Sequence, residues 1–338
     1  MAKDRIMSPK RNRKLSESVV EELQKRSGKG LEFARRTMLA EKIEYVGLRE
    51  ALEHYAVNWN DFTHPGLFSL AYEAVGGDPD NAVQVQAAIA MLAAAFDVHD
   101  DIIDGSEQKH GVPTVFGKYG KDVALLLGNA FLIKGLALFC VSIETLAQKN
   151  AQKVIEALQA SLFELGNAHA MELNLRRRID AEPAEYMRVV EMKAAGIEAD
   201  MWIGAKVGGG SNKEVEALTR YGRNLGILAT LREEFVDVFE IEELNQRIRG
   251  GYLPIPILYA LQNEATEERL SKLIAEGKAT KSEVDDIVGT VFEEKGVKKL
   301  RKRMANLVNE SLHLTLGIGD KKLRMQLADL ASSMIEDL

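Results

Sequence analysis

The feature of this sequence that most restricts its fold is a group of acidic residues at the end of an apolar helix. An apolar run, Ala87 to Phe96, continues without Gly or Pro into Asp97, Asp100, Asp101 and Asp104. These four positions share one face of a helix with 3.6 residues per turn. Like charges at this spacing destabilise a helix by roughly 0.2–0.5 kcal/mol per pair, and burying them without partners costs more. The pattern therefore predicts a buried helix whose acidic end binds a cation.

Carboxylates without a neighbouring cysteine favour a hard cation such as Mg²⁺, which binds one or two carboxylates together with water and substrate phosphates. The alternative is a solvated acidic helix end. A second stretch, Leu225 to Glu240, repeats the pattern, because Glu233, Glu234 and Asp237 follow an apolar helical lead at the same spacing. Two such helices facing each other would form a cage of six carboxylates. The repetition favours the metal site.

Length and composition predict one large helical domain. The chain has 338 residues, of which 46% are hydrophobic, and it can bury a large core. Length alone suggests two domains, but helix formers dominate and only 7 prolines occur. We therefore expect a single all-helical domain over residues 15–338, preceded by a basic lead, residues 1–14, that is compatible with disorder. A net charge of −7 without a basic, aromatic-rich stripe argues against a nucleic-acid partner.

The remaining signals favour a soluble cytoplasmic protein. The single cysteine, Cys140, excludes an intramolecular disulfide and fits a reducing compartment, and we expect it in the core. No apolar segment of the secretory type follows the basic N-terminus. The segment Val123 to Ile143 is long enough to span a bilayer. It contains Asn129 and Lys134 and lies between helical stretches, so we interpret it as a buried helix of a bundle.

The hydrophobic periodicity predicts helices along most of the chain, with no β-type alternation of useful length. The predicted helical segments are residues 15–55, 67–75, 80–103, 121–145, 150–178, 183–206, 225–240, 255–261 and 266–338. The first of these contains two helices and the last contains three or four. A polar loop, Gly105 to Gly120, carries Lys109 and His110. Lys193 lies on a largely apolar helix, where an unpaired ammonium is costly, so we expect it to contact an anion.

These residues together resemble the trans-polyprenyl diphosphate synthase family, which includes farnesyl and geranylgeranyl diphosphate synthases. The stretch HDDIID followed by KHGVPT is similar to the family's first aspartate-rich motif and the segment after it. Glu233, Glu234 and Asp237 occupy the second aspartate-rich motif with two Asp replaced by Glu, and Lys193 matches the lysine of the KT motif. The resemblance implies an isoprenoid synthase class I helical bundle around a central cavity, and a homodimer that buries the helix from Val123 to Ile143.

The resemblance also implies a site that ionises an allylic prenyl diphosphate. In the family, three Mg²⁺ ions bridge the two acidic motifs to the diphosphate and stabilise it as the C–O bond breaks. The implied metal ligands are Asp100, Asp101, Asp104, Glu233, Glu234 and Asp237. The catalytic residues implied by the resemblance are Asp100, Asp101, Asp104 and Lys193. The residues implied to bind the allylic diphosphate are Lys109 and Lys193.

The departures from the family pattern lie on the side of the second substrate. Asp61, His64, Ala93 and His110 stand where the family has a lysine, an arginine, a polar residue and an arginine that hold the diphosphate of isopentenyl diphosphate. Losing two arginines removes charge-assisted hydrogen bonds of roughly 1.5–3 kcal/mol each. Together with the repulsion from Asp61, this loss would lower the affinity for isopentenyl diphosphate about a thousandfold. The sequence therefore predicts an intact ionisation half and an altered acceptor half.

Three functions remain open from the sequence. The first is Mg²⁺-dependent ionisation of an allylic prenyl diphosphate with transfer to an unknown acceptor, which includes isopentenyl diphosphate held by other residues such as Arg247 or Arg249. The second is terpene synthase-like cyclisation or hydrolysis without isopentenyl diphosphate. The third is a non-catalytic subunit of a prenyl synthase. The allylic substrate is expected at about C10–C20. Ala95 and Phe96 occupy the family's chain-length positions and loosely favour C15–C20 within that range, although Phe96 is equally compatible with a core role.

Overall fold

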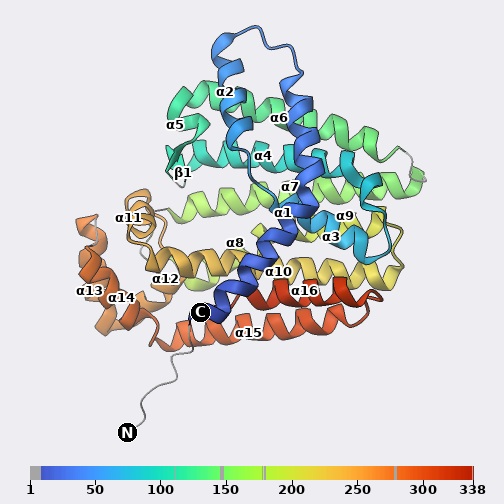
Figure 1. The fold of residues 1–338 in the computed structure, drawn as a ribbon. Coiled ribbons are helices and arrows are strands. Elements are labelled where there is room, and N and C mark those ends of the chain that lie inside the picture. The colour runs from blue at the N-terminus through green and yellow to red at the C-terminus, as the bar shows by residue number, and fades with distance from the viewer. Residues whose placement is uncertain are drawn as a thin grey trace.

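The computed structural model describes residues 9–109, 111–144, 148–176, 178, 180–277, 280–336 and 338. Nearly all of them lie in helices (Figure 1). The elements are α1 (Pro9–Leu39), α2 (Val46–Asn58), α3 (Thr63–Ala74), η1 (Pro79–Ala82), α4 (Val83–Asp104), β1 (Gln108–Lys109), β2 (Val112–Pro113), α5 (Val115–Tyr119), α6 (Lys121–Ser142), α7 (Gln148–Leu175), α8 (Pro183–Lys193), α9 (Ala195–Val207), α10 (Asn212–Phe239), α11 (Ile241–Gly250), α12 (Ile255–Leu261), α13 (Glu264–Glu276), α14 (Lys281–Val291), α15 (Lys295–Thr315) and α16 (Lys321–Ser333). The all-α prediction is confirmed.

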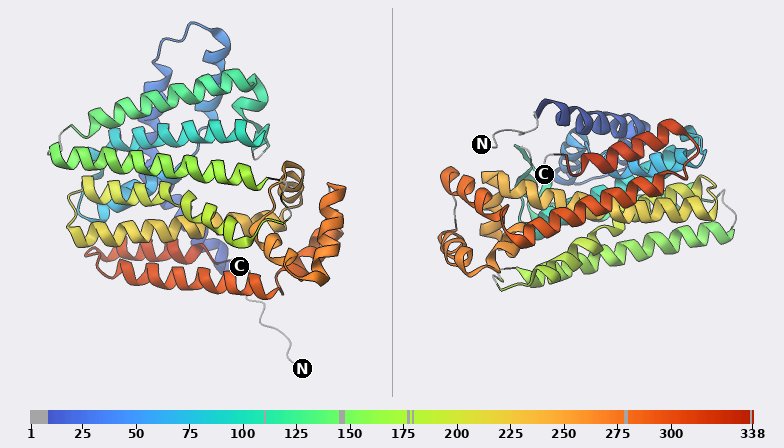
Figure 2. Two further views of the ribbon diagram at one scale, coloured as in Figure 1. Left: turned by 180° about the vertical axis from the view of Figure 1, so that it is seen from behind. Right: turned by 90° about the horizontal axis from the view of Figure 1, so that it is seen from below.

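Most of the long helices run in roughly one direction, and α1 crosses over one face of the bundle (Figure 1). Figure 2 shows α1 and α7 on opposite faces, while α13 and α14 extend from one end. Helix α1 begins at Pro9, inside the stretch that the sequence assigned to the N-terminal lead, and residues 1–8 lie outside the described residues. The predicted polar loop after α4 contains a two-residue antiparallel hairpin, β1–β2, and the short helix α5.

Helix α4 lies at the centre of the bundle. It packs along α6 and also contacts α1 and α3. Its fully buried alanines, such as Ala87, Ala90 and Ala94, let the neighbouring helices approach closely. The helix ends at Gly105, whose φ of +69° is the left-handed conformation that favours glycine at a helix C-terminus. The buried core helix that the sequence predicted here is confirmed, and its acidic end emerges from the core.

Helix α6 corrects one expectation, because it is largely exposed. α4 and α6 are both long and apolar enough to cross a membrane, and 67% of the apolar window of α4 is buried but only 33% of that of α6. Small and aromatic residues of α6, including Gly128 and Phe131, pack on α4. Its opposite side exposes Leu126 (56%), Ile133 (68%) and Val141 (56%). Cys140 is exposed too, where the sequence predicted a core position.

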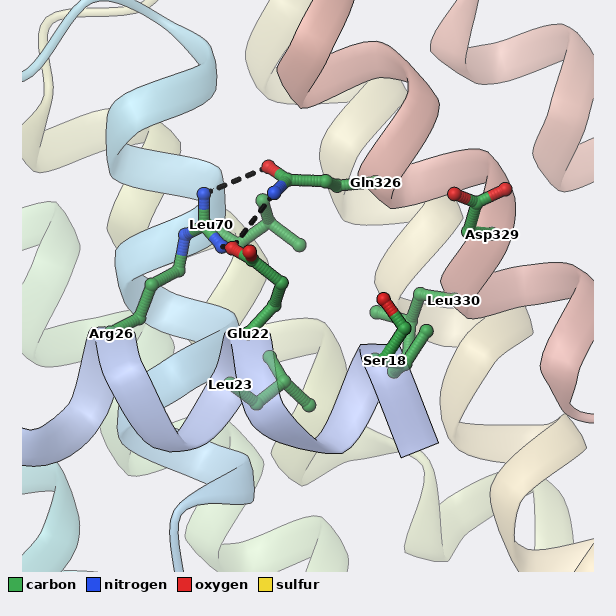
Figure 3. Close-up of a pocket in the computed structure, with 9 residues that line it drawn as sticks. Ser18, Glu22, Leu23, Arg26, Leu70, Gln326, Asp329 and Leu330 are labelled. Carbon is green, nitrogen blue, oxygen red and sulfur yellow. Dashed lines mark hydrogen bonds and ion pairs between the residues drawn. The ribbon is translucent and has the colours of Figure 1, made fainter. Parts of the chain in front are cut away.

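The N- and C-terminal helices are joined by a cluster of polar side chains (Figure 3). Arg26 of α1 donates hydrogen bonds to Glu22, Glu73 and Gln326, and Gln326 of α16 donates to Glu22. The small cavity beside this cluster has a volume of about 30 Å³, which is room for a water molecule rather than a substrate. We therefore assign this cluster a structural role.

Candidate active site

The central cavity of the bundle has a volume of about 480 Å³ and is lined by α3, α4, α7, α9 and α10, together with Lys193 at the end of α8. Its inner wall is apolar and is formed by Ile89, Leu92, Phe96, Leu158, Leu162, Leu165 and Ile203. Its polar lining includes Asp97, Asp100, His169, Lys193 and Glu233. An apolar chamber with acidic and basic side chains on one side suits a ligand that has an apolar tail and a charged head.

The four aspartates of α4 have different neighbours. Asp100 lines the cavity, and its carboxylate lies 3.3 Å from His169 Nδ1. Asp97 and Asp101 share the ammonium of Lys109, at 2.6 and 2.8 Å. Because the hairpin β1–β2 carries Lys109, this pairing fixes the loop onto the end of α4.

Asp104, one turn further along α4, is held by residues from two other elements. Its Oδ1 atom accepts hydrogen bonds from Arg176 and from the Tyr252 hydroxyl, both at 2.9 Å. The guanidinium of Arg176 also stacks over the Tyr252 ring at 4.1 Å, a cation–π contact. The end of α7 and the turn after α11 are thereby brought against the acidic end of α4.

The acidic residues of α10 also differ in their neighbours. Glu233 lines the cavity and is solvent-accessible, and none of the described residues forms a hydrogen bond or an ion pair with it. Glu234 is buried. Its carboxylate accepts hydrogen bonds from the Tyr186 hydroxyl at 3.0 Å and the Ile255 backbone N–H at 2.9 Å, and it forms an ion pair with Arg247. The same arginine lies 3.2 Å from Asp237.

Lys193 meets an anion, as the sequence predicted, but that anion is a protein carboxylate. Its ammonium lies 2.5 Å from Glu172 of α7. The Tyr186 hydroxyl, which is also within hydrogen-bond distance of Glu234, lies 3.1 Å from the other Glu172 oxygen. The charge of Lys193 lowers the pKa of Asp100 and of Glu233, although burial raises both overall. One ammonium therefore interacts with both acidic sets, which places them around a common space.

A close helix contact brings Lys193 and Glu233 together. Gly226 of α10 lies against Ala194, the residue that follows Lys193 between α8 and α9. A Cβ atom at Gly226 would lie 2.7 Å from the Ala194 Cα, closer than real side chains approach. Glycine at this position therefore allows the close approach of α10 to the start of α9. Glu233 follows two helical turns later on α10.

Burial raises the pKa of several of these acids. Burial raises the pKa of Asp101 and of Asp237 to about 6, despite the cations beside them. Burial and the charge of Asp104 raise the pKa of Asp100, and burial and the charge of Asp237 raise that of Glu233. In these carboxylates the effect of burial outweighs that of the neighbouring cations, and a bound divalent cation would stabilise the charged forms.

The six predicted metal ligands do not form a ready-made cage. Within the described residues, no three or more His, Cys, Asp or Glu side chains are arranged to hold a metal ion by themselves. Asp101 is occupied by Lys109, and both oxygens of Glu234 are occupied by protein groups. The donor set nevertheless fits a hard cation, because it consists of carboxylates with unbalanced charge. A ligand phosphate would complete the coordination of an ion held by so few free carboxylates.

The altered acceptor positions lie in the central cavity. Asp61, His64 and Ala93 all line it, whereas His110 lies outside the described residues. His64 Nδ1 is 2.6 Å from Asp200 Oδ2 of α9. Burial alone would lower the pKa of His64, but the carboxylates of Asp200 and Asp61 outweigh it and raise that pKa to about 9. His64 and Asp200 therefore form an ion pair at neutral pH.

A second cavity, of about 310 Å³, adjoins the first. Two carboxylates, Asp61 and Asp97, line both cavities. The second cavity is otherwise bounded by the end of α2, the segment after it, α4 and the hairpin β1–β2, and it includes Lys109 and Asp101. The two cavities therefore adjoin at Asp61 and Asp97.

The two chain-length positions occupy different environments. Phe96 lines the inner wall of the central cavity. Ala95 is fully buried in a different cluster, which includes Leu52 and Leu127, and it is not among the residues that line the cavity. Neighbouring residues on a helix point about 100° apart, so the assignment of Ala95 to the pocket is corrected.

Sequence reasoning missed six residues of this site. They are His169, Glu172, Arg176, Tyr186, Asp200 and Tyr252. Two carried a signal, because Glu172 and Asp200 are acids within helices whose neighbouring positions are apolar. The others become evident only when elements distant in the chain lie together.

Comparisons with known proteins show which sequences and folds this chain is similar to. The sequence model of the polyprenyl synthetase family matches residues 48–291. The chain is 31% identical to the short chain isoprenyl diphosphate synthase of Methanothermobacter thermautotrophicus over 241 residues, 68% of this chain and 72% of that protein. It is 27% identical to a geranylgeranyl diphosphate synthase of Sulfolobus acidocaldarius, over 70% and 72%. The crystal structure of geranylgeranyl pyrophosphate synthetase from Pyrococcus horikoshii superposes with a TM-score of 0.84 at 24% identity, covering 96% and 99% of the two chains.

Proposed function

Because this chain belongs to the polyprenyl synthetase family, we propose that it ionises an allylic prenyl diphosphate of about C10–C20 in a Mg²⁺-dependent reaction and transfers the prenyl group to an acceptor. The observation that carries the proposal is the central cavity. Its apolar inner wall suits a prenyl chain, and the acids of α4 and α10 meet around Lys193 beside it. An apolar chamber also keeps water from an allylic carbocation.

The acids fall into two roles in this proposal. Asp100 and Asp104 from α4, with Glu233 and Asp237 from α10, hold Mg²⁺ jointly with the substrate diphosphate. Bound Mg²⁺ supplies the positive charge that stabilises the departing diphosphate. Asp101 and Glu234 are buried as well as bound by Lys109 and by Arg247, so we assign them to positioning those two cations. Asp104 and Asp237 also have protein partners, but both remain partly exposed.

Two lysines contact the diphosphate in this proposal. Lys193 reaches into the cavity and interacts with both acidic sets. The Lys109 ammonium has three N–H donors, and two of them contact Asp97 and Asp101. The third can donate to a phosphate oxygen. Phe96 on the inner wall limits the length of the prenyl chain. The acceptor lies beside Asp61, His64 and Ala93, where His64 is already paired with Asp200.

We also propose a cytoplasmic homodimer. The exposed apolar side of α6 is continuous along the helix and includes Leu126, Ile133 and Val141. A second copy that covered this side would remove apolar area from water at about 25 cal/mol per Å². Exposed Cys140 on the same helix fits a reducing compartment, and we propose no membrane span.

Diphosphate release tests the proposed reaction. Purified protein is incubated with geranyl, farnesyl or geranylgeranyl diphosphate, with and without Mg²⁺ and isopentenyl diphosphate. We expect Mg²⁺-dependent release of inorganic diphosphate, and a loss of at least a hundredfold in Asp100→Asn, because the amide removes an anionic metal ligand. Asp80→Asn is the matched control, since Asp80 pairs with Lys29 on the surface away from the cavity. An Asp100→Asn rate equal to that of the control would refute the metal assignment.

A further inference from the structure

A chain of polar contacts runs from Lys193 to Arg247 through three buried side chains. Lys193 pairs with Glu172 at 2.5 Å. The second oxygen of Glu172 lies 3.1 Å from the Tyr186 hydroxyl, and this hydroxyl lies 3.0 Å from Glu234, which pairs with Arg247. Glu172, Tyr186 and Glu234 are 7%, 3% and 5% exposed, so they depend on protein groups for their hydrogen bonds. Of these five residues, Lys193 alone lines the central cavity.

The Tyr186 hydroxyl lies between two carboxylate oxygens but has one hydrogen to donate. It can therefore donate to Glu172 or to Glu234, but not to both at once. Because both oxygens already lie within hydrogen-bond distance, a rotation of the O–H bond is enough to exchange one acceptor for the other. No other atom has to move.

The two carboxylates differ in what they keep when the Tyr186 hydrogen points away. Glu234 keeps Arg247 and the Ile255 backbone N–H, which donates at 2.9 Å. Glu172 has only Lys193 and Tyr186 as hydrogen-bond or ion-pair partners among the described residues. A buried carboxylate without a partner is costly. If Lys193 turned to another anion, the Tyr186 hydroxyl would be the one group left in place to stabilise Glu172.

Glu172 carries a charge at neutral pH. Burial would raise its pKa, but Lys193, the charge of Arg247 and the Tyr186 hydroxyl together outweigh burial and lower it. The negative charge of Glu172 therefore competes for the Lys193 ammonium with any anion that enters the cavity.

We propose that Tyr186 is a positioning residue that allows Lys193 to exchange Glu172 for the substrate diphosphate. This inference rests on the proposed function, in which Lys193 binds the allylic diphosphate. Without a ligand, Lys193 pairs with Glu172 and Tyr186 donates to Glu234. When a diphosphate draws the ammonium away, the Tyr186 hydroxyl turns and donates to Glu172. The charge of Glu172 then keeps a hydrogen bond, which lowers the cost of releasing Lys193.

Removal of one oxygen atom tests the inference. Tyr186→Phe keeps the ring but leaves Glu172 dependent on Lys193 alone. Calorimetry at saturating Mg²⁺ measures the Kd for farnesyl thiolodiphosphate, an unreactive analogue of farnesyl diphosphate. We expect this Kd to rise at least fivefold in Tyr186→Phe, because Glu172 then retains the ammonium.

Tyr221→Phe is the matched control. Tyr221 is also fully buried and donates a hydrogen bond to the Leu327 carbonyl at 2.7 Å, but it does not line the cavity. Its loss should change the Kd less than twofold. Equal Kd values in Tyr186→Phe and Tyr221→Phe would overturn the inference. Failure of the original protein to bind the analogue at all would instead overturn the proposed function.

Glu172→Gln separates positioning from a structural role. The amide keeps the shape of the side chain but removes the charge that competes for Lys193, so the Kd should not rise more than twofold. In this background Tyr186→Phe should also change the Kd less than twofold, because no carboxylate is left to stabilise. A fivefold rise in Glu172→Gln itself, or the same loss from Tyr186→Phe in both backgrounds, would overturn the inference. Thermal unfolding of each variant confirms that folded protein is compared.

Discussion

At the scale of single residues, two adjacent glutamates of α10 have opposite surroundings. Glu233 reaches into the cavity and has no protein partner among the described residues. Glu234, one position later, is 5% exposed and is bound by Tyr186, Arg247 and the Ile255 backbone. Adjacent positions on a helix point about 100° apart, so the same residue type serves two purposes. One is available to a ligand and the other stabilises the fold.

This difference predicts opposite effects of two matched substitutions. Glu234→Ala should lower the free energy of unfolding by about 3–5 kcal/mol, because Arg247 then keeps only the partly exposed Asp237 and the buried Ile255 N–H loses its acceptor. Glu233→Ala should change it by less than about 0.5 kcal/mol, since no protein contact is lost, but should abolish diphosphate release. Urea denaturation and a diphosphate assay measure the two effects. Equal destabilisation by both variants would contradict the division of roles.

The ion pair between His64 and Asp200 predicts a dependence on pH. The pKa of His64 is raised to about 9 in the folded protein, against about 6.5 in an unfolded chain. Its contribution to stability is therefore complete below about pH 6.5 and is lost as the pH rises through 9. NMR titration of the imidazole should give a midpoint near 9. In Asp200→Asn the midpoint should fall below 6.5, the ordinary pKa of histidine, because only the charge of Asp61 then opposes the effect of burial. The control Asp80→Asn should keep the midpoint of the original protein.

At the scale of elements, α4 and α6 show how far an apolar helix can be interpreted from sequence. Both are long and apolar, and both were predicted to be buried. Helix α4 is surrounded by α1, α3 and α6, while α6 packs on α4 along one side and exposes the other. Periodicity could not separate the two cases, because α6 is apolar on both sides. Only the number of neighbours decides whether such a helix is buried within one chain.

The exposed side of α6 predicts the oligomeric state. The original protein should sediment as a dimer, and the double variant Leu126→Lys, Ile133→Lys should sediment as a monomer, because four lysines would then lie in the two-fold contact. Leu316→Lys is the matched control, since Leu316 is 66% exposed and follows α15. Analytical ultracentrifugation measures the masses. A monomeric original protein, or a dimeric double variant, would contradict the proposed interface.

At the scale of the whole molecule, the site exists because five helices from different parts of the chain enclose one cavity. Gly226 sets the distance between α10 and the start of α9, and Lys193 interacts with both acidic sets. On the far side, Arg26 ties α1 to α16 and to α3 through Gln326 and Glu73. These contacts fix the bundle around the cavity, so the positions of the acids depend also on residues such as Arg26 that lie away from the cavity.

The sequence by itself determined the helical class, the two acidic sets and the need of Lys193 for an anion. Each depends on local spacing or on the cost of burying charge, which are properties of short stretches. The three-dimensional arrangement decided how each acid is engaged. Asp101, Asp104, Glu234 and Asp237 have protein partners from other elements, whereas Glu233 has none among the described residues. It also paired His64 with Asp200 across 136 positions and turned Ala95 away from the cavity. Contacts between distant elements follow from packing, and a local pattern carries no record of them.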